Sequence, residues 1–76
     1  METQALSALT VQLLTWVAEQ PRTYGEAMDA WRTSCPRMPI WEDAMSQGLI
    51  DIEGSGTMRE REVRLSKRGR VMLGRH

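Results

Sequence analysis

The chain has 76 residues, ten Lys and Arg against ten Asp and Glu, and a hydrophobic fraction of 41%. This composition predicts one small globular domain over residues 1–76 and argues against wholesale disorder. No apolar run approaches the roughly 18 residues that a membrane span needs, and the first residues lack an export-signal pattern. A single cysteine excludes an internal disulfide and a cysteine-based zinc site. We therefore expect a small, reduced, cytoplasmic module that does not contact a membrane.

The neutral net charge hides an asymmetry along the chain. Residues 1–53 carry three basic and eight acidic side chains, a net charge of −5. Residues 54–76 carry seven basic and two acidic side chains, a net charge of +5. This segregation indicates a basic surface at one end of the fold, suited to an anionic partner. The alternative is a solvated basic tail that binds nothing.

Apolar residues spaced by three and four predict a first amphipathic helix over residues 6–18. Pro21 ends it, because the residue before a proline is pushed out of the helical region. Thr23 and Glu26 then have the spacing of a capping box. The box predicts a second helix over residues 24–32.

A third helix is expected over residues 39–47. Pro39 suits the first position of a helix, because the missing amide proton has no partner there. Gly48 suits the residue after the last turn, where the backbone commonly turns left-handed.

Near Gly48 the spacing of the hydrophobic residues changes from a period of about 3.6 residues, typical of a helix, to a period of two residues, typical of a strand. Residues 49–53 alternate as a strand, a Gly-Ser-Gly-Thr turn follows, and residues 58–66 contain the alternation Val63-Arg64-Leu65, which predicts a β-hairpin with a loose, polar tip. Ser66 can cap a short final helix over residues 67–73. Gly69 lies inside that helix and weakens it by about 1 kcal/mol relative to alanine.

One apolar face from each element supplies the expected core of this α+β fold. Trp16, Trp31 and Trp41 should meet in the core rather than stack on bases, because each lies on the apolar stripe of its helix. The full expected core is Leu9, Leu13, Trp16, Val17, Ala27, Met28, Trp31, Ile40, Trp41, Leu49, Ile52, Val63 and Leu65, with Val71, Met72 and Leu73 added by the final helix.

Three stretches resemble the winged helix-turn-helix family of bacterial regulators. Residues 20–27 (Gln-Pro-Arg-Thr-Tyr-Gly-Glu-Ala) are similar to the join into the second helix, and residues 47–50 (Gln-Gly-Leu-Ile) to the turn into the wing. Residues 63–70 (Val-Arg-Leu-Ser-Lys-Arg-Gly-Arg) resemble the second wing strand and the Leu-Thr-x-x-Gly turn of MarR-like regulators, with Ser66 in the threonine's place. The resemblance covers roughly residues 11–73. It implies a winged helix, with a three-helix core, a C-terminal β-hairpin wing and a short final helix.

The resemblance implies double-stranded DNA binding by a transcriptional regulator or a fragment of one. The third helix would lie toward the major groove and the basic wing along the phosphate backbone. Glu42 and Asp43 on the third helix would repel phosphates, so a winged-helix protein-interaction or dimerisation module without DNA binding is the alternative. The candidate DNA contacts are Arg37, Met38, Arg59, Arg61, Arg64, Lys67 and Arg68.

DNA-binding helix-turn-helix proteins usually act as symmetric dimers. This chain lacks the long extra helices with which MarR-like proteins dimerise. We therefore expect a monomer, a weak homodimer through the first and last helices, or a subunit of a larger complex.

Catalytic chemistry is not expected. Cys35 and His76 would have to touch to form a nucleophile pair, and a terminal histidine makes a poor general base. A redox-sensing Cys35, activated by neighbouring arginines, is a second interpretation. The sequence has no glycine-rich phosphate loop and no metal-ligand spacing, so we expect neither an enzyme nor a cofactor.

Overall fold

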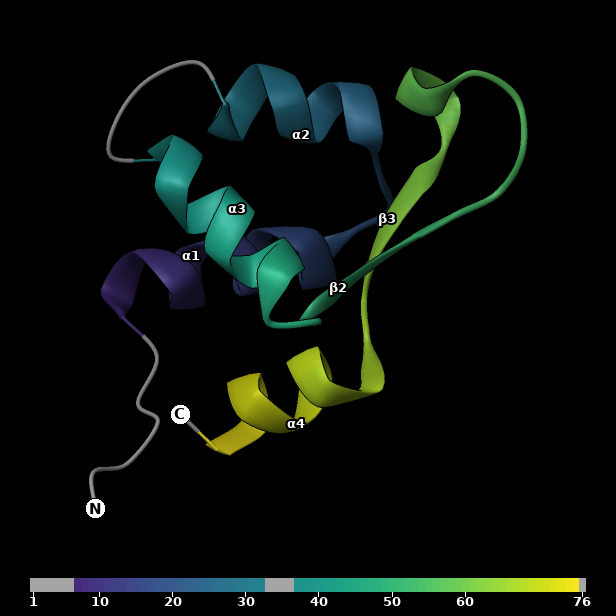
Figure 1. Cartoon of the computed structure of the whole chain (residues 1–76). Coiled ribbons are helices and arrows are strands. Elements are labelled where there is room, and N and C mark those ends of the chain that lie inside the picture. Colours follow the sequence, from purple (N-terminus) through teal and green to yellow (C-terminus); the bar gives the residue numbers. More distant parts are fainter. Residues whose placement is uncertain (1–6, 33–36, 76) are drawn as a thin grey trace.

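A computed structural model describes residues 7–32 and 37–75 (Figure 1). Three antiparallel strands form one sheet in the order β1-β3-β2, and the helices do not enclose it: Val63 and Leu65 of the central strand are buried, whereas Arg64 between them is exposed. The chain is thus a small α+β domain, as predicted, and its layout is compatible with the expected winged helix. In chain order the elements are α1 (Ala8–Glu19), β1 (Arg22–Thr23), α2 (Tyr24–Trp31), α3 (Arg37–Ser46), β2 (Ile50–Glu53), a 3₁₀ turn η1 (Met58–Glu60), β3 (Glu62–Leu65) and α4 (Lys67–Arg75).

The central strand β3 joins the two outer strands. It pairs with β2 along its whole length, from Ile50 opposite Leu65 to Glu53 opposite Glu62. The two residues of β1 pair with the tip-side half of β3, Thr23 opposite Glu62. Strand β1 was not predicted, because two residues after a proline carry no periodic signal. None of the helices in the described part of the chain is long and apolar enough to cross a membrane.

Local capping chemistry determines where the first two helices begin. Ser7 caps α1 by accepting a hydrogen bond from the Thr10 amide at 3.1 Å. The predicted capping box of α2 is confirmed: the Glu26 amide donates to Thr23 Oγ1 at 3.1 Å, and the Thr23 amide donates to Glu26 Oε1 at 2.8 Å. Each pair satisfies amides that the first helical turn leaves without a backbone partner.

The third helix begins earlier than predicted. It starts at Arg37, so the prediction that Pro39 opens the helix is wrong. Pro39 is tolerated as the third residue because amides of the first turn have no intrahelical acceptor. The predicted end is confirmed: Gly48 has a φ of 72°, and the Leu49 amide donates to the Ala44 carbonyl at 3.0 Å.

The core differs from the expected set at a few positions. Leu9, Trp16, Met28, Ile40 and Ile52 are only partly buried, whereas the core set given above lacks Leu14, Ala44 and Ile50, which are buried. Val71 was also expected inside and is 46% exposed, because α4 turns Met72 and Leu73 toward the core instead. The buried hydrophobic residues are Leu13, Leu14, Val17, Ala27, Trp31, Trp41, Ala44, Leu49, Ile50, Val63 and Leu65.

The three tryptophans all belong to this core or pack against it, as predicted. The Trp16 ring contacts the Trp31 ring, with centroids 6.5 Å apart, and the Trp41 ring contacts that of Tyr24, with centroids 6.1 Å apart. Trp16 is the partly exposed member, and the Arg22 guanidinium covers its ring at 4.1 Å. The aromatic rings therefore join α1, α2 and α3 into one unit.

Candidate functional site

The hairpin β2–β3 extends beyond the helices, and its connecting residues 54–60 are exposed (Figure 1). Gly54 and Gly56 have φ values of 104° and 93°, which residues with a side chain rarely adopt. The returning chain forms η1 and then pairs with the start of α2, where the Tyr24 amide donates to the Arg61 carbonyl at 2.8 Å. The hairpin end is therefore anchored on α2 rather than free in solvent.

Arg59 lies on α2. Its Nη2 donates to Asp29 Oδ2 at 3.2 Å, and both side chains are largely exposed, at 63% and 72%. A Cβ built on Gly25 would lie 3.1 Å from Cζ, Nε and Nη2 of Arg59, so the guanidinium lies flat over this glycine. Neither Gly25 nor Asp29 was singled out in the sequence, because no local pattern marks a contact across 30 residues.

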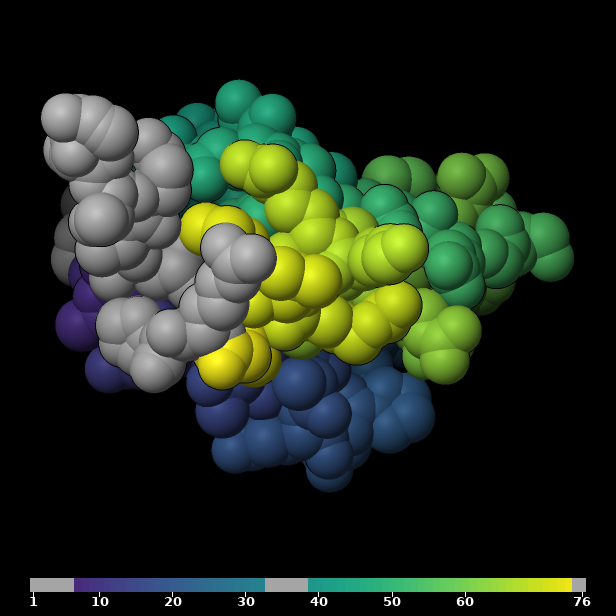
Figure 2. Space-filling model, turned by 90° about the horizontal axis from the view of Figure 1, so that it is seen from below, coloured from purple at the N-terminus to yellow at the C-terminus, as the bar shows by residue number. Residues whose placement is uncertain are grey.

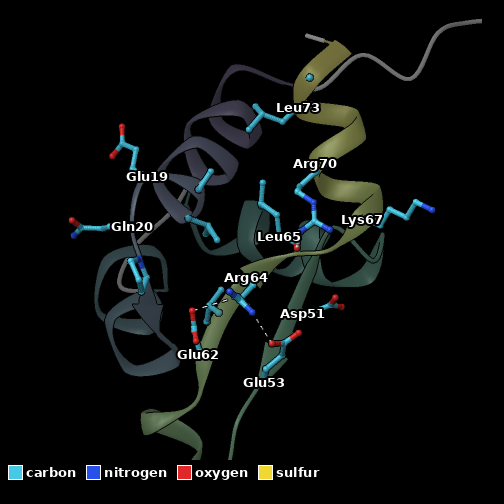
Figure 3. Close-up of a pocket in the computed structure, with 15 residues that line it drawn as sticks. Glu19, Gln20, Asp51, Glu53, Glu62, Arg64, Leu65, Lys67, Arg70 and Leu73 are labelled. Carbon is cyan, nitrogen blue, oxygen red and sulfur yellow. Dashed lines mark hydrogen bonds and ion pairs between the residues drawn. The ribbon is translucent and has the colours of Figure 1, made fainter.

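Arg64 is held between two carboxylates on the sheet surface. Its Nη1 lies 3.3 Å from Glu53 Oε1, and its Nε lies 3.4 Å from Glu62 Oε2 (Figure 3). Arg61 differs from the expected exposed arginine: it is half-buried, and its buried Nε has no hydrogen-bond acceptor among the described residues. Replacing Arg61 would therefore disturb packing as well as charge.

Lys67 and Arg68 open α4 and are exposed. Figure 2 shows the face that α4 forms, with the hairpin projecting beside it. No ion pair to Lys67 or Arg68 is present within residues 7–32 and 37–75. The neighbouring Arg70 donates from Nη1 to the Leu65 carbonyl at 3.1 Å. Lys67 and Arg68 are thus exposed basic candidates without an ion pair in the described part of the chain.

The solvent side of α3 is acidic. Glu42 and Asp43 are exposed there, whereas Trp41 and Ala44 face the core. Arg37 and Met38 are the first two residues of α3. The interpretations that involve Cys35 and His76 lie outside the described residues.

An open hollow of about 810 Å³ lies between the end of α1, the sheet and α4 (Figure 3). Val17, Leu65 and Leu73 contribute apolar surface, and Arg64 with its two carboxylates forms part of the sheet side. Within the described ranges, no three His, Cys, Asp or Glu residues lie together as a metal site requires. The hollow therefore offers a mixed apolar and charged surface without a metal-binding cluster.

No family model, curated protein or solved structure matches this chain. The structural features that bear on function are therefore the geometry and charge of the hairpin, α3 and the start of α4.

Proposed function

We propose that this chain binds double-stranded DNA as a winged helix, with the β2–β3 hairpin as the wing and α3 toward the major groove. The observation that carries the proposal is the exposed hairpin, which has arginines between residues 59 and 64. The hairpin lies next to the three helices α1 to α3, and its strands belong to a sheet with the order β1-β3-β2. Winged helices bind duplex DNA with this combination of a recognition helix and a flanking hairpin. The basic side chains would contact phosphates and release counterions.

The internal ion pairs of the hairpin do not oppose this function strongly. Arg59 and Arg64 are 63% and 57% exposed, and their carboxylate partners are also exposed to solvent. Exposed ion pairs contribute only about 0–1 kcal/mol, because water and salt screen them. A DNA backbone presents many phosphates at once, so it can replace such carboxylates at small cost.

The start of α4 gives independent support. Lys67 and Arg68 occupy the first turn, where the positive end of the helix dipole disfavours cations. Neither forms an ion pair with a carboxylate of the described residues. An anionic partner would compensate both charges.

A second candidate function is protein docking without DNA binding. It is favoured by Glu42 and Asp43, which make the exposed side of α3 acidic where a DNA-binding helix usually presents basic or amide side chains. A partner with a basic surface would suit this helix.

Titration of a duplex of mixed sequence at about 50 mM salt, where phosphate contacts are strongest, tests the first proposal. Arg59→Ala should weaken binding to every duplex and flatten the plot of log affinity against log salt by up to about 0.9. The matched control is Arg59→Lys, which keeps the charge and should keep the slope. Arg59 is the better choice over Arg61, which is half-buried.

The acidic helix supplies a second variant. The change Glu42→Ala with Asp43→Ala should strengthen DNA binding, because it removes two charges that repel phosphates. An absence of binding at low salt by both the wild type and this double variant would overturn the DNA proposal in favour of docking.

A further inference from the structure

Arg59 is the hairpin side chain most closely tied to a helix. Its guanidinium lies flat over Gly25 and donates to Asp29, one helical turn further along α2. Gly25 lacks a Cβ, so the backbone of α2 leaves room for the guanidinium; an alanine there would bring a methyl group to 3.1 Å from it. The surface of α2 therefore binds the Arg59 side chain in two ways: Gly25 leaves space for the guanidinium, and Asp29 pairs with its charge.

We propose that Asp29 competes with DNA phosphates for Arg59, so that α2 limits how tightly the hairpin binds DNA. This inference depends on the proposed function and concerns the regulation of the same site. While the guanidinium of Arg59 lies over Gly25 and donates to Asp29, that carboxylate compensates part of its positive charge, so a phosphate that draws the group away from α2 must replace this contact. Binding then exchanges one carboxylate for one phosphate oxygen, with only the long arginine side chain moving.

The structure favours such an exchange because the internal contact is single and accessible. One nitrogen–oxygen distance of 3.2 Å joins the two side chains, and Asp29 is 72% exposed. Contacts of this kind are weak. The expected effect of releasing Arg59 is accordingly a gain in DNA affinity of about two- to five-fold, the equivalent of up to about 1 kcal/mol.

Two variants release Arg59 by different means. Asp29→Asn removes the competing charge and keeps the size of the side chain. Gly25→Ala keeps every charge, brings a methyl group to 3.1 Å from the guanidinium so that the guanidinium must shift by a few tenths of an ångström, and favours the helix intrinsically. Asp29→Asn should bind duplex DNA about two- to five-fold more tightly than the wild type, and Gly25→Ala should show a smaller gain; both should keep the salt slope, because the number of phosphate contacts is the same.

Two controls separate this competition from a general charge effect. In an Arg59→Gln background, Asp29→Asn and Gly25→Ala should leave affinity unchanged, because no arginine remains to be released. Asp51→Asn removes another exposed carboxylate, one that has no ion pair in the described part of the chain, and it should have a smaller effect than Asp29→Asn. Circular dichroism and thermal unfolding of each variant verify the fold.

The outcomes distinguish the competition from DNA binding itself. If the wild type binds DNA and neither variant binds more tightly, or if the gain persists with Arg59→Gln, the competition is refuted and the proposed function stands. If only the released variants bind, the competition is strongly supported. If neither the wild type nor any variant binds at low salt, both proposals fail.

Discussion

Gly69 allows helix α4 to approach the residues that lead into β2 closely. A Cβ at this position would overlap the carbonyl oxygen of Leu49, the residue that leads into β2. The same oxygen accepts a hydrogen bond from the Ser66 amide at 3.0 Å. Helix propensity alone predicted Gly69 to weaken the final helix, but the contact shows that a glycine is what lets α4 close on this turn.

We therefore expect Gly69→Ala to destabilise the domain by about 1–3 kcal/mol, the usual cost of overpacking, despite the better helix propensity of alanine. Urea unfolding followed by tryptophan fluorescence measures this free energy. Gly74→Ala is the matched control in the same helix, since a Cβ there meets nothing within 4 Å, and it should leave stability unchanged or raise it slightly. A neutral Gly69→Ala would show that α4 can move away from Leu49 without loss.

At the scale of elements, hydrogen bonds at the helix ends divide the chain into its parts. Thr23 and Glu26 begin α2, and Gly48 ends α3 with the Gly48 amide donating to Met45 and the Leu49 amide to Ala44. These bonds satisfy carbonyls that the last helical turn leaves open. They also set the direction in which the chain leaves α3. Because β2 begins two residues after Gly48, the end of α3 determines where the hairpin starts.

The left-handed conformation at Gly48 gives a prediction for this junction. Gly48→Ala should lower the free energy of unfolding by about 1–2 kcal/mol, because a Cβ disfavours a φ of 72° even with open space around it. Gly48→Asn is the conservative comparison, and asparagine adopts this conformation at lower cost. Equal stability of Gly48→Ala and the wild type in urea unfolding would contradict the strain argument.

At the scale of the whole molecule, the apolar core and the surface charges have separate roles. The buried hydrophobic side chains of all helices but α4, and of β2 and β3, form one cluster, against which Met72 and Leu73 of α4 pack. Every ion pair found within residues 7–32 and 37–75 has at least one side chain more than half exposed. Burial of hydrophobic side chains therefore supplies most of the folding stability, and the exposed charged side chains contribute little to it.

This separation predicts different salt responses for folding and for binding. Raising the NaCl concentration from about 50 mM to about 500 mM should change the free energy of unfolding by less than about 1 kcal/mol, because exposed pairs contribute little and are already screened. DNA affinity should fall at least tenfold over the same range if several phosphates are contacted. Parallel urea unfolding and DNA titrations at both salt concentrations measure the two responses. A loss of several kcal/mol in folding stability would mean that the ion pairs hold the structure together.

The sequence by itself determined the helix ends at Pro21, Thr23 and Gly48, the hairpin, and the cap of α4 by Ser66, whose Oγ accepts from the Gly69 amide at 2.9 Å. These features follow from interactions between residues a few positions apart, and such interactions leave a periodic or capping pattern in the sequence. The candidate basic residues of the hairpin and of the start of α4 could also be named from charge alone.

Only the tertiary structure decided which of those basic side chains are exposed and which already have a carboxylate partner. The pairing of β1 with β3, the partners of Arg59 and Arg64, the burial of Arg61 and the need for Gly69 each join segments far apart along the chain. The α2 face that receives Arg59 is 30 residues away from it in sequence. No local pattern encodes such contacts, because they arise only when packing of the core brings the hairpin against α2.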